Sequence, residues 1–325
     1  MEHLTFEQLS SDANGFDEAV LRSPGIDHFC SSSMWILPAS EHLMAPGQPW
    51  IRRSNGSYVA LACTDSSAGT RVLHPLEAMW ALGSPLVGAY PHELAELLIS
   101  SLAADGSWDA VVLTGIAEDS TLWKTLVPAL GRRYVLTRGP VTRRYVADLS
   151  GGEQAFLAKR SPGFRKNLRK AERRARQLEL SFEVADDGAL EDVDASFERL
   201  LAIERRSWKG RRGVGIDTEP MSTFYRAMNR RLVERGARRL VFATIDGNDA
   251  AFIFGGVLGN TYRGLQFSFD DAYTEHSLGN LCQLAEIRRL SDDGVLVYDL
   301  GTELTYKKRW GERVFATSCL IVHSS

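Results

Sequence analysis

The sequence has few features of metal-binding, disulfide-bonded or membrane-spanning proteins. Its four cysteines form no CxxC pair, and its seven histidines show no HxxxH or HxH spacing. We therefore expect buried, reduced thiols rather than a zinc site or a disulfide framework. No run approaches the ~20 apolar residues that span a bilayer. The N-terminus also lacks the basic and apolar regions of a secretory signal. We expect a cytoplasmic protein with no metal and no permanently bound cofactor.

Three common enzyme signatures are also missing. The chain contains no GxSxG elbow, no Walker phosphate loop and no Rossmann glycine fingerprint. Ser-His-Asp hydrolysis, kinase chemistry and nicotinamide redox chemistry are therefore disfavoured.

The composition is that of an ordinary globular protein whose charge is unevenly distributed. The chain has 325 residues, 44% hydrophobic and 24% charged, with a net charge of −3. This length suggests two domains. Residues 1–150 hold 10 Lys and Arg against 16 Asp and Glu, whereas residues 151–325 hold 28 against 25. The excess positive charge is concentrated in residues 159–176, which hold nine basic residues and a single acid.

The second half shows the clearer pattern of secondary structure. Helical periodicity and hairpin-turn residues predict helix, strand, two helices, three antiparallel strands, helix, strand, helix, strand. The predicted elements are 167–178, 180–184, 190–208, 221–234, 240–245, 251–258, 261–269, 278–290, 295–299, 306–310 and 314–322.

The first half repeats the later part of this order more faintly. Strands are expected near Trp50, Tyr134 and Arg144 and over 58–63, 71–73 and 110–113, with helices over 91–104 and 120–130. A glycine pair after Ser150 separates the halves. We therefore predict domains 1–149 and 150–325, each with a mixed, mostly antiparallel sheet flanked by helices, which is an α/β (α+β) class.

Five short motifs, in this order, resemble the GNAT acyltransferase fold. They are Phe164–Lys170, Glu204–Gly210, Phe269–Tyr273, Ser277–Leu281 and Gly301–Gly311. The set is most similar to an acetyltransferase-like (CelD/BcsL-like) bacterial family found near polysaccharide genes. Two tandem GNAT-like halves also resemble the Fem family, whose members transfer amino acids from charged tRNA to amines. The resemblance implies a degenerate N-terminal domain followed by an acyltransferase domain.

The resemblance places the donor at a gap between two splayed strands, facing the N-terminus of the next helix. A helix N-terminus has unpaired N–H groups that can bind phosphate. Here that helix start is Ser277, Gly279, Asn280 and Leu281, but the usual coenzyme A glycine loop is reduced to one glycine. An ordinary Ser-capped helix is the alternative. Arg165, Arg169 and Arg173 are expected to contact donor phosphates, or to form a solvated helix face.

Glu204 is the most informative single residue. It lies near the centre of an apolar helix face formed by residues such as Phe197, Leu201 and Trp208. A carboxylate in such a place is costly unless it is paired or used, so Glu204 is a candidate general base. The alternative is that it pairs with Arg205 or Lys209.

Further candidates follow from the remaining motifs. Asp270 could act as a base and Asp271 could orient the acceptor, although two acids at a strand end also suit a solvated turn. Tyr273 could donate a proton to the leaving group or be structural. Lys307 in a Fem-like Lys-x-x-Trp-Gly segment could stabilise negative charge, with Glu303 either assisting or only pairing with it at i,i+4. Trp208, Lys209 and Trp310 complete the expected substrate contacts.

These features favour an N-acyltransferase, and three hypotheses about the function remain. The first uses an acyl-coenzyme A donor and the amine of a small molecule or peptide as acceptor. The second uses aminoacyl-tRNA and forms a peptide bond, which the two-half architecture, the reduced loop and the basic helix favour. The third is a non-catalytic module that binds RNA or a partner.

Overall fold

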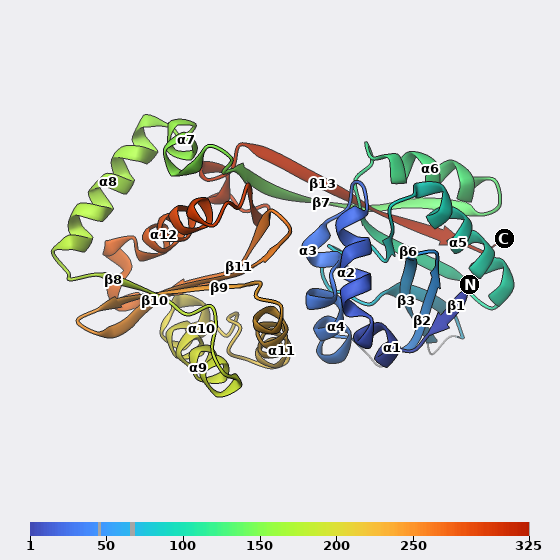
Figure 1. Ribbon diagram of the computed structural model, residues 1–325, viewed down its shortest axis with the longest axis horizontal. Coiled ribbons are helices and arrows are strands. Elements are labelled where there is room, and N and C mark those ends of the chain that lie inside the picture. Colours follow the sequence, from blue (N-terminus) through green and yellow to red (C-terminus); the bar gives the residue numbers. More distant parts are fainter. Residues whose placement is uncertain (45–46, 66–68, 325) are drawn as a thin grey trace. The chain divides into compact units, whose positions relative to one another are not determined.

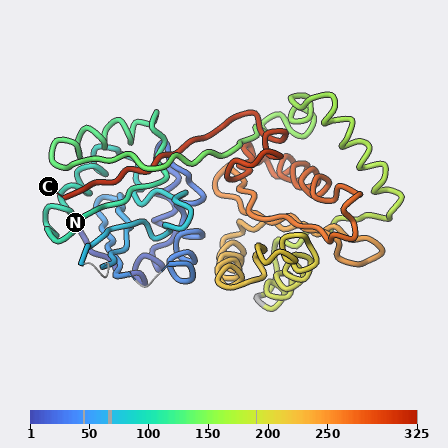
Figure 2. The backbone as a smooth tube through the Cα atoms, turned by 180° about the vertical axis from the view of Figure 1, so that it is seen from behind, coloured from blue at the N-terminus to red at the C-terminus, as the bar shows by residue number. Residues whose placement is uncertain are grey.

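The computed structural model describes residues 1–44, 47–65 and 69–324, which form two compact units. Unit 1 comprises Met1–Arg143 and Phe315–Ser325, and unit 2 comprises Arg144–Val314. The predicted boundary at residues 149 and 150 therefore differs in two respects. Strand β7 (Val135–Asp148) enters unit 2 before its end, and strand β13 (Arg313–His323) returns to unit 1 because it pairs there with β6 (Ala110–Ile116). Both chain ends consequently lie in unit 1 (Figure 2).

Unit 1 is a mixed sheet with helices packed on it. Its strand order is β1-β2-β3-β4-β6-β13, with β5 paired to β3. Helix α5 packs on β2 and β3, and α2 packs on β3 and β5. The remaining bounds are β1 (Glu2–Leu4), α1 (Phe6–Ser11), α2 (Ala13–Arg22), α3 (His28–Ser31), α4 (Ser33–His42), β2 (Gln48–Ser54), β3 (Ser57–Asp65), β4 (Arg71–Pro75), β5 (Leu86–Val87), α5 (Pro91–Asp105) and α6 (Thr121–Gly131).

Unit 2 is a second mixed sheet, of order β7-β12-β11-β10-β9-β8. Figure 1 shows α7, α8 and α12 on one face of this sheet and α9, α10 and α11 on the other. The bounds are α7 (Gly152–Ala158), α8 (Pro162–Arg176), β8 (Ser181–Val184), α9 (Leu190–Arg206), α10 (Trp208–Arg211), α11 (Met221–Glu234), β9 (Arg238–Ile245), β10 (Asn248–Leu258), β11 (Thr261–Phe269), η1 (Asp271–His276), α12 (Leu278–Asp292), β12 (Val297–Thr302) and η2 (Lys307–Arg309).

The two units share one connectivity. In unit 2, β9, β10 and β11 form an antiparallel meander, α12 follows, and β12 runs parallel to β11. In unit 1, β2, β3 and β4 form the meander, α5 follows, and β6 runs parallel to β4. The predicted class, two similarly built α/β halves with mixed sheets flanked by helices, is therefore confirmed.

The core of unit 2 explains why α12 is fixed against the sheet. Its side chains Leu284, Ile287 and Leu290 pack with Tyr262 and Tyr298 of the two parallel strands. Burying apolar area of this kind is the main favourable contribution to folding.

The same helix also buries a carboxylate, Glu286, which has no accessible surface. Its oxygens accept no hydrogen bond from any described residue, and Arg289 Nη1 lies 3.7 Å from Oε2. Burial therefore dominates and raises the pKa of Glu286 to about 8.

No helix among the described residues is long and apolar enough to cross a bilayer. All four cysteines are buried, and none of them forms a disulfide.

Candidate functional site

The parallel strands β11 and β12 of unit 2 separate after their first three residue pairs. They pair in register from Thr261 and Val297 to Arg263 and Asp299, and no further. A pocket opens where the pairing ends. It is lined by Ile253, Gly264, Leu265, Gln266, Phe267, Gln283, Tyr298, Leu300, Tyr306 and Lys307. We call this space the splay pocket; the predicted gap between two splayed strands is thus present.

A β-bulge in β11 lies at the mouth of the splay. Gly255 of β10 opposes Gly264, and Phe254 opposes Gln266, so Leu265 is an extra residue without a partner. A bulge bends its strand and re-aims the side chains that follow. Past the bulge, the ring of Phe267 packs towards α12, while Gln266 points to the opposite face and donates to Tyr225 Oη at 2.9 Å.

Lys307 is the cationic side chain of the splay pocket. Its Nζ donates to the carbonyl of Thr302 at 3.0 Å. Burial, helped by the nearby Arg263 guanidinium, lowers the pKa of Lys307 to about 8. Next to it, burial raises the pKa of Tyr306 to about 12. The ammonium of Lys307 is therefore still mostly charged at neutral pH and lies in the lining of the splay pocket.

Glu204 is fully buried at the end of α9, as its place on the apolar face implies. Its Oε1 lies 3.3 Å from Lys209 Nζ and accepts the Ile216 N–H at 3.2 Å. Of the two predicted pairings, the one with Lys209 is therefore the one present. Oε2 is buried and accepts no hydrogen bond from the described residues.

The acids at the end of β11 form ion pairs outside the splay pocket. Asp270 Oδ2 lies 2.6 Å from Arg206 Nε, and its Oδ1 accepts the Ala272 N–H, so that it caps η1. Asp271 lies 3.1 Å from Arg211. Tyr273 is partly buried and packs against the core formed by α8, α12, β9 and β10. Neither acid lines the splay pocket, and the packing of Tyr273 is that of the structural alternative.

The start of α12 is more closely packed than the sequence suggested. Ser277 has a left-handed backbone (φ 59°), and its side chain makes no capping bond. A Cβ on Gly279 would lie 2.8 Å from Phe267 Cε2, so that ring occupies the space expected for a ligand. Leu281 belongs to the core, and Asn280 is exposed.

Trp310 and Glu303 lie elsewhere than expected. Trp310 is only 2% exposed, and it packs between Phe156 and Phe164 in the core rather than facing a substrate. Only Lys307–Arg309 form a helical turn, of the 3-10 type, so Glu303 is not on the expected short helix with Lys307. Glu303 instead accepts a hydrogen bond from Tyr145 Oη at 2.9 Å.

Trp208 is half exposed, and it lies under the guanidinium of Arg212.

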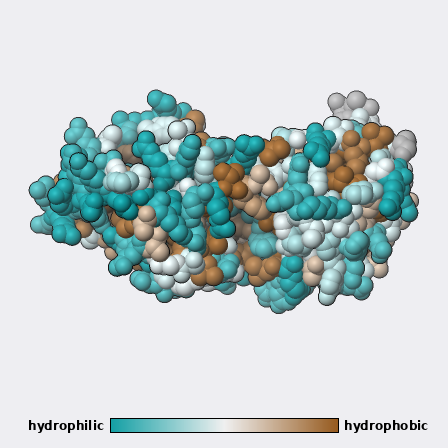
Figure 3. Space-filling view, turned by 90° about the horizontal axis from the view of Figure 1, so that it is seen from above, coloured by the Kyte–Doolittle hydropathy of each residue, from teal (hydrophilic) through white to brown (hydrophobic). Residues whose placement is uncertain are grey.

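The basic helix α8 carries most of its charge without acidic partners. Leu168, Ala171 and Ala175 are buried, and the one acid, Glu172, pairs with Arg288. Arg165 donates to the carbonyl of Ala158 at 3.3 Å. Arg169 and Arg173 are exposed, and neither makes an ion pair with any described residue. The surface on the α8 side, at the left of Figure 3, is predominantly hydrophilic.

Several residues of the site are absent from the predicted set. Gln266, Gln283 and Tyr306 line the splay pocket, and Asp217 lies beside Glu204 in the loop after α10. The bulge that decides which face Gln266 takes and which face Phe267 takes has no marker in the sequence other than the nearby glycines Gly255, Gly256 and Gly264.

The corresponding splay of unit 1 is filled by its own chain. Strands β4 and β6 pair only at Val72–Leu73 and Ala110–Val111. Beyond them, Thr114 Oγ1 donates to the Gly83 carbonyl at 2.5 Å, and a Cβ on Gly115 would lie 2.4 Å from Gly83. In the segment between β4 and β5, which contains Gly83, the buried Glu77 carboxylate accepts the Trp80 N–H at 2.6 Å.

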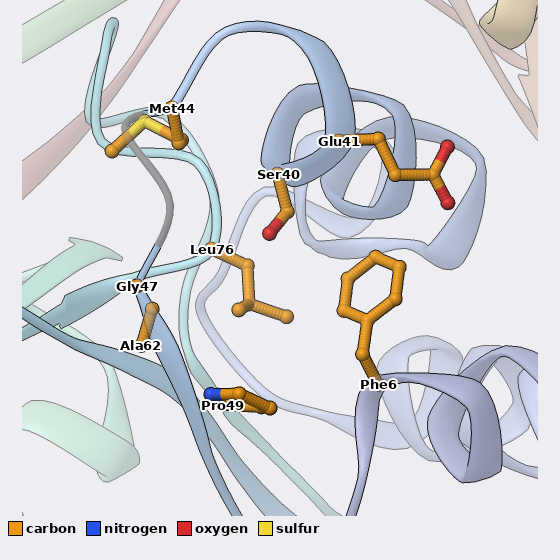
Figure 4. Close-up of a pocket in the computed structure, with 8 residues that line it drawn as sticks. All are labelled: Phe6, Ser40, Glu41, Met44, Gly47, Pro49, Ala62 and Leu76. Atoms are coloured by element: carbon orange, nitrogen blue, oxygen red, sulfur yellow. The ribbon is translucent and has the colours of Figure 1, made fainter.

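A separate pocket in unit 1 lies between α1, α4, β2 and β3 (Figure 4). Phe6, Leu76 and the hydroxyl of Ser40 face the same space, while the carboxylate of Glu41 points away from it. The lining is mostly apolar and pairs no nucleophile with a base. The splay pocket of unit 2 is therefore the better candidate for chemistry.

Most of unit 2 matches a known domain. Residues 162–309, a little under half of the chain, match the family model described as acetyltransferase (GNAT) domain. This part of the chain has the GNAT fold. Together with the fold, the match supports an acyltransferase.

Solved structures share the architecture over 85% or more of the chain. FemX matches with a TM-score of 0.67 at 12% identity, over 98% of this chain and 97% of its own. A conserved protein of unknown function from Bacteroides thetaiotaomicron matches with a TM-score of 0.65 at 11% identity, over 99% and 98%. L-PGS from Bacillus licheniformis matches with a TM-score of 0.50 at 12% identity, over 85% and 84%. At these identities the likeness concerns the fold. No curated protein matches the chain in sequence.

Proposed function

We propose that unit 2 is an N-acyltransferase that uses acyl-coenzyme A and acylates the amine of a small molecule or a peptide. The observation that carries this proposal is the splay pocket with Lys307 inside it, in the part of the chain that matches the GNAT domain. The pocket combines apolar walls for an acyl group with one cation, which suits a reaction whose transition state develops negative charge on a carbonyl oxygen.

In the proposed reaction the acceptor nitrogen attacks the thioester carbonyl carbon. The C–N bond forms, the C–S bond breaks, and the leaving thiolate takes up the proton that the amine loses. The Lys307 ammonium donates to the oxygen of the tetrahedral intermediate. Positioning the two reactants supplies much of the remaining rate enhancement.

Glu204 has a less direct part in this proposal than the sequence suggested. A general base has to come within hydrogen-bonding distance of the proton that it removes. Glu204 has no accessible surface, and Lys209 links it to the pocket wall at Gln266 and Phe267. We therefore assign the contact with the reacting carbonyl to Lys307.

A second candidate donor is aminoacyl-tRNA, and the observation that favours it is α8. From Lys166 to Arg176 this helix presents basic side chains over eleven residues, about 15 Å along its axis. A stripe of that length can follow several successive phosphates of a nucleic-acid backbone.

The donor is tested by supplying each candidate separately with a set of primary amines. Release of free thiol from acetyl-coenzyme A, dependent on the amine, supports the first donor. Transfer from charged tRNA that RNase abolishes supports the second. Binding of RNA without transfer from either donor would favour a non-catalytic module.

A further inference from the structure

Lys209 is the second residue of α10. Its side chain connects the helices α9 and α10 to the part of β11 that lines the splay pocket. Its Nζ donates to the carbonyl of Phe267 at 3.0 Å and to Gln266 Oε1 at 3.1 Å, and it lies 3.3 Å from Glu204 Oε1. Three acceptors thus surround an ammonium that has three protons to donate. Only 17% of the side chain is exposed.

The loop after α10 brings a second carboxylate to this cluster. A Cβ on Gly215 would lie 2.5 Å from Asp217 Oδ1 and 3.0 Å from Glu204 Oε1, so the two oxygens are within 5.5 Å of each other, the sum of these distances. Burial lowers the pKa of Lys209, and the charges of Glu204 and Asp217 oppose that shift. The two acids therefore favour the charged form that holds the strand.

The residues that Lys209 holds lie where β11 is least supported. Gln266 and Phe267 come after the bulge and beyond Arg263, the last residue that pairs with β12. On that side the strand has no neighbour, because the splay pocket lies there. A bond from α10 to the Phe267 carbonyl restrains this part of the wall from outside the sheet.

We propose that Lys209 is a positioning residue that fixes the β11 wall of the splay pocket, and that Glu204 acts through it. The inference rests on the proposed function for its consequence, which is tighter binding of the donor. The restraint that Lys209 places on β11 can be tested on the free protein, without any donor.

The first experiment is hydrogen exchange on the free protein. Lys209→Met is expected to raise amide exchange in residues 264–269 at least tenfold. The matched control is Lys124→Met, because Lys124 Nζ also donates to a backbone carbonyl, that of Asp119 at 2.6 Å, but in unit 1. Unchanged exchange in a folded Lys209→Met protein would overturn the proposal. If that variant does not fold, Asp217→Asn is measured instead, and a rise in the same peptide is required.

The second experiment measures coenzyme A affinity by calorimetry. Lys209→Met and Glu204→Gln should each weaken binding severalfold, and the double variant should be no weaker than the worse single one, because one acts through the other. Additive losses would overturn the assignment to Glu204. If the wild type does not bind coenzyme A, the proposed donor fails, and the exchange result alone decides the role of Lys209.

Discussion

Replacing Lys307 with methionine removes the one positive charge that is proposed to contact the oxygen of the reacting carbonyl. The loss of one oxyanion donor typically lowers kcat by about 100- to 1000-fold. Because the pKa of Lys307 is about 8, about nine-tenths of the wild type carries the charge at pH 7 and about one-tenth at pH 9. The ratio of wild-type to variant kcat should therefore fall about tenfold between these pH values.

The sign of this change separates two roles for the lysine. A charged lysine that stabilises the oxyanion contributes below its pKa, and the contribution is lost as the pH rises through about 8. A neutral lysine that acts as a base would contribute above that pH, and the ratio would rise. Taking the ratio cancels the ionisation of the acceptor amine, which affects both proteins equally.

The assay is thiol release from acetyl-coenzyme A at saturating amine, between pH 6.5 and 9.5. Lys308→Met is the matched control, since Lys308 is the exposed neighbour in the same turn. A ratio that stays constant or rises with pH would refute the proposed role of Lys307. So would an equal loss of activity in both variants.

Three further changes test other parts of the account. Glu286→Gln should stabilise the protein increasingly between pH 4.5 and 8, by about 3 kcal/mol at pH 7. The reason is that a buried carboxyl with a raised pKa costs stability once the same group ionises in the unfolded chain. Urea unfolding measures the change, and the control Glu234→Gln, at an exposed position, should show no dependence of this kind on pH. Gly279→Ala should cost about 1–3 kcal/mol in the same assay, since its Cβ would overpack the core. Replacing Arg169 and Arg173 with Glu should weaken the binding of charged tRNA, the second candidate donor, severalfold. An affinity that does not change would exclude α8 from the donor site.

The sequence predicts the elements of unit 2 well where local signals agree. Helix α11 has the predicted bounds, because its amphipathic pattern ends at Gly236. The meander follows from hairpin turns at Asp246–Gly247 and Gly259–Asn260, each between strands of β-forming residues. By contrast, separate strands were expected near Tyr134 and near Arg144, where the structure has the single strand β7.

The candidate site is only partly predictable, for reasons of tertiary packing. Lys307 lines the splay pocket, whereas Trp310 in the same motif faces the core. A short motif does not reveal which side of the chain meets the sheet. The link from Lys209 to Gln266 spans 57 residues, and it depends on a bulge that decides which face Gln266 takes.

The central claim is that the splay pocket of unit 2 binds the acyl donor and that unit 1 does not. Calorimetric titration with acetyl-coenzyme A, which carries the carbonyl that Lys307 is proposed to contact, tests it most directly, in the wild type and in Lys307→Met. The account predicts one site per chain, because the splay of unit 1 is filled by its own residues around Gly83 and Glu77, and it predicts weaker binding in the variant. Two sites per chain, no binding at millimolar acetyl-coenzyme A, or equal affinity in both proteins would contradict it.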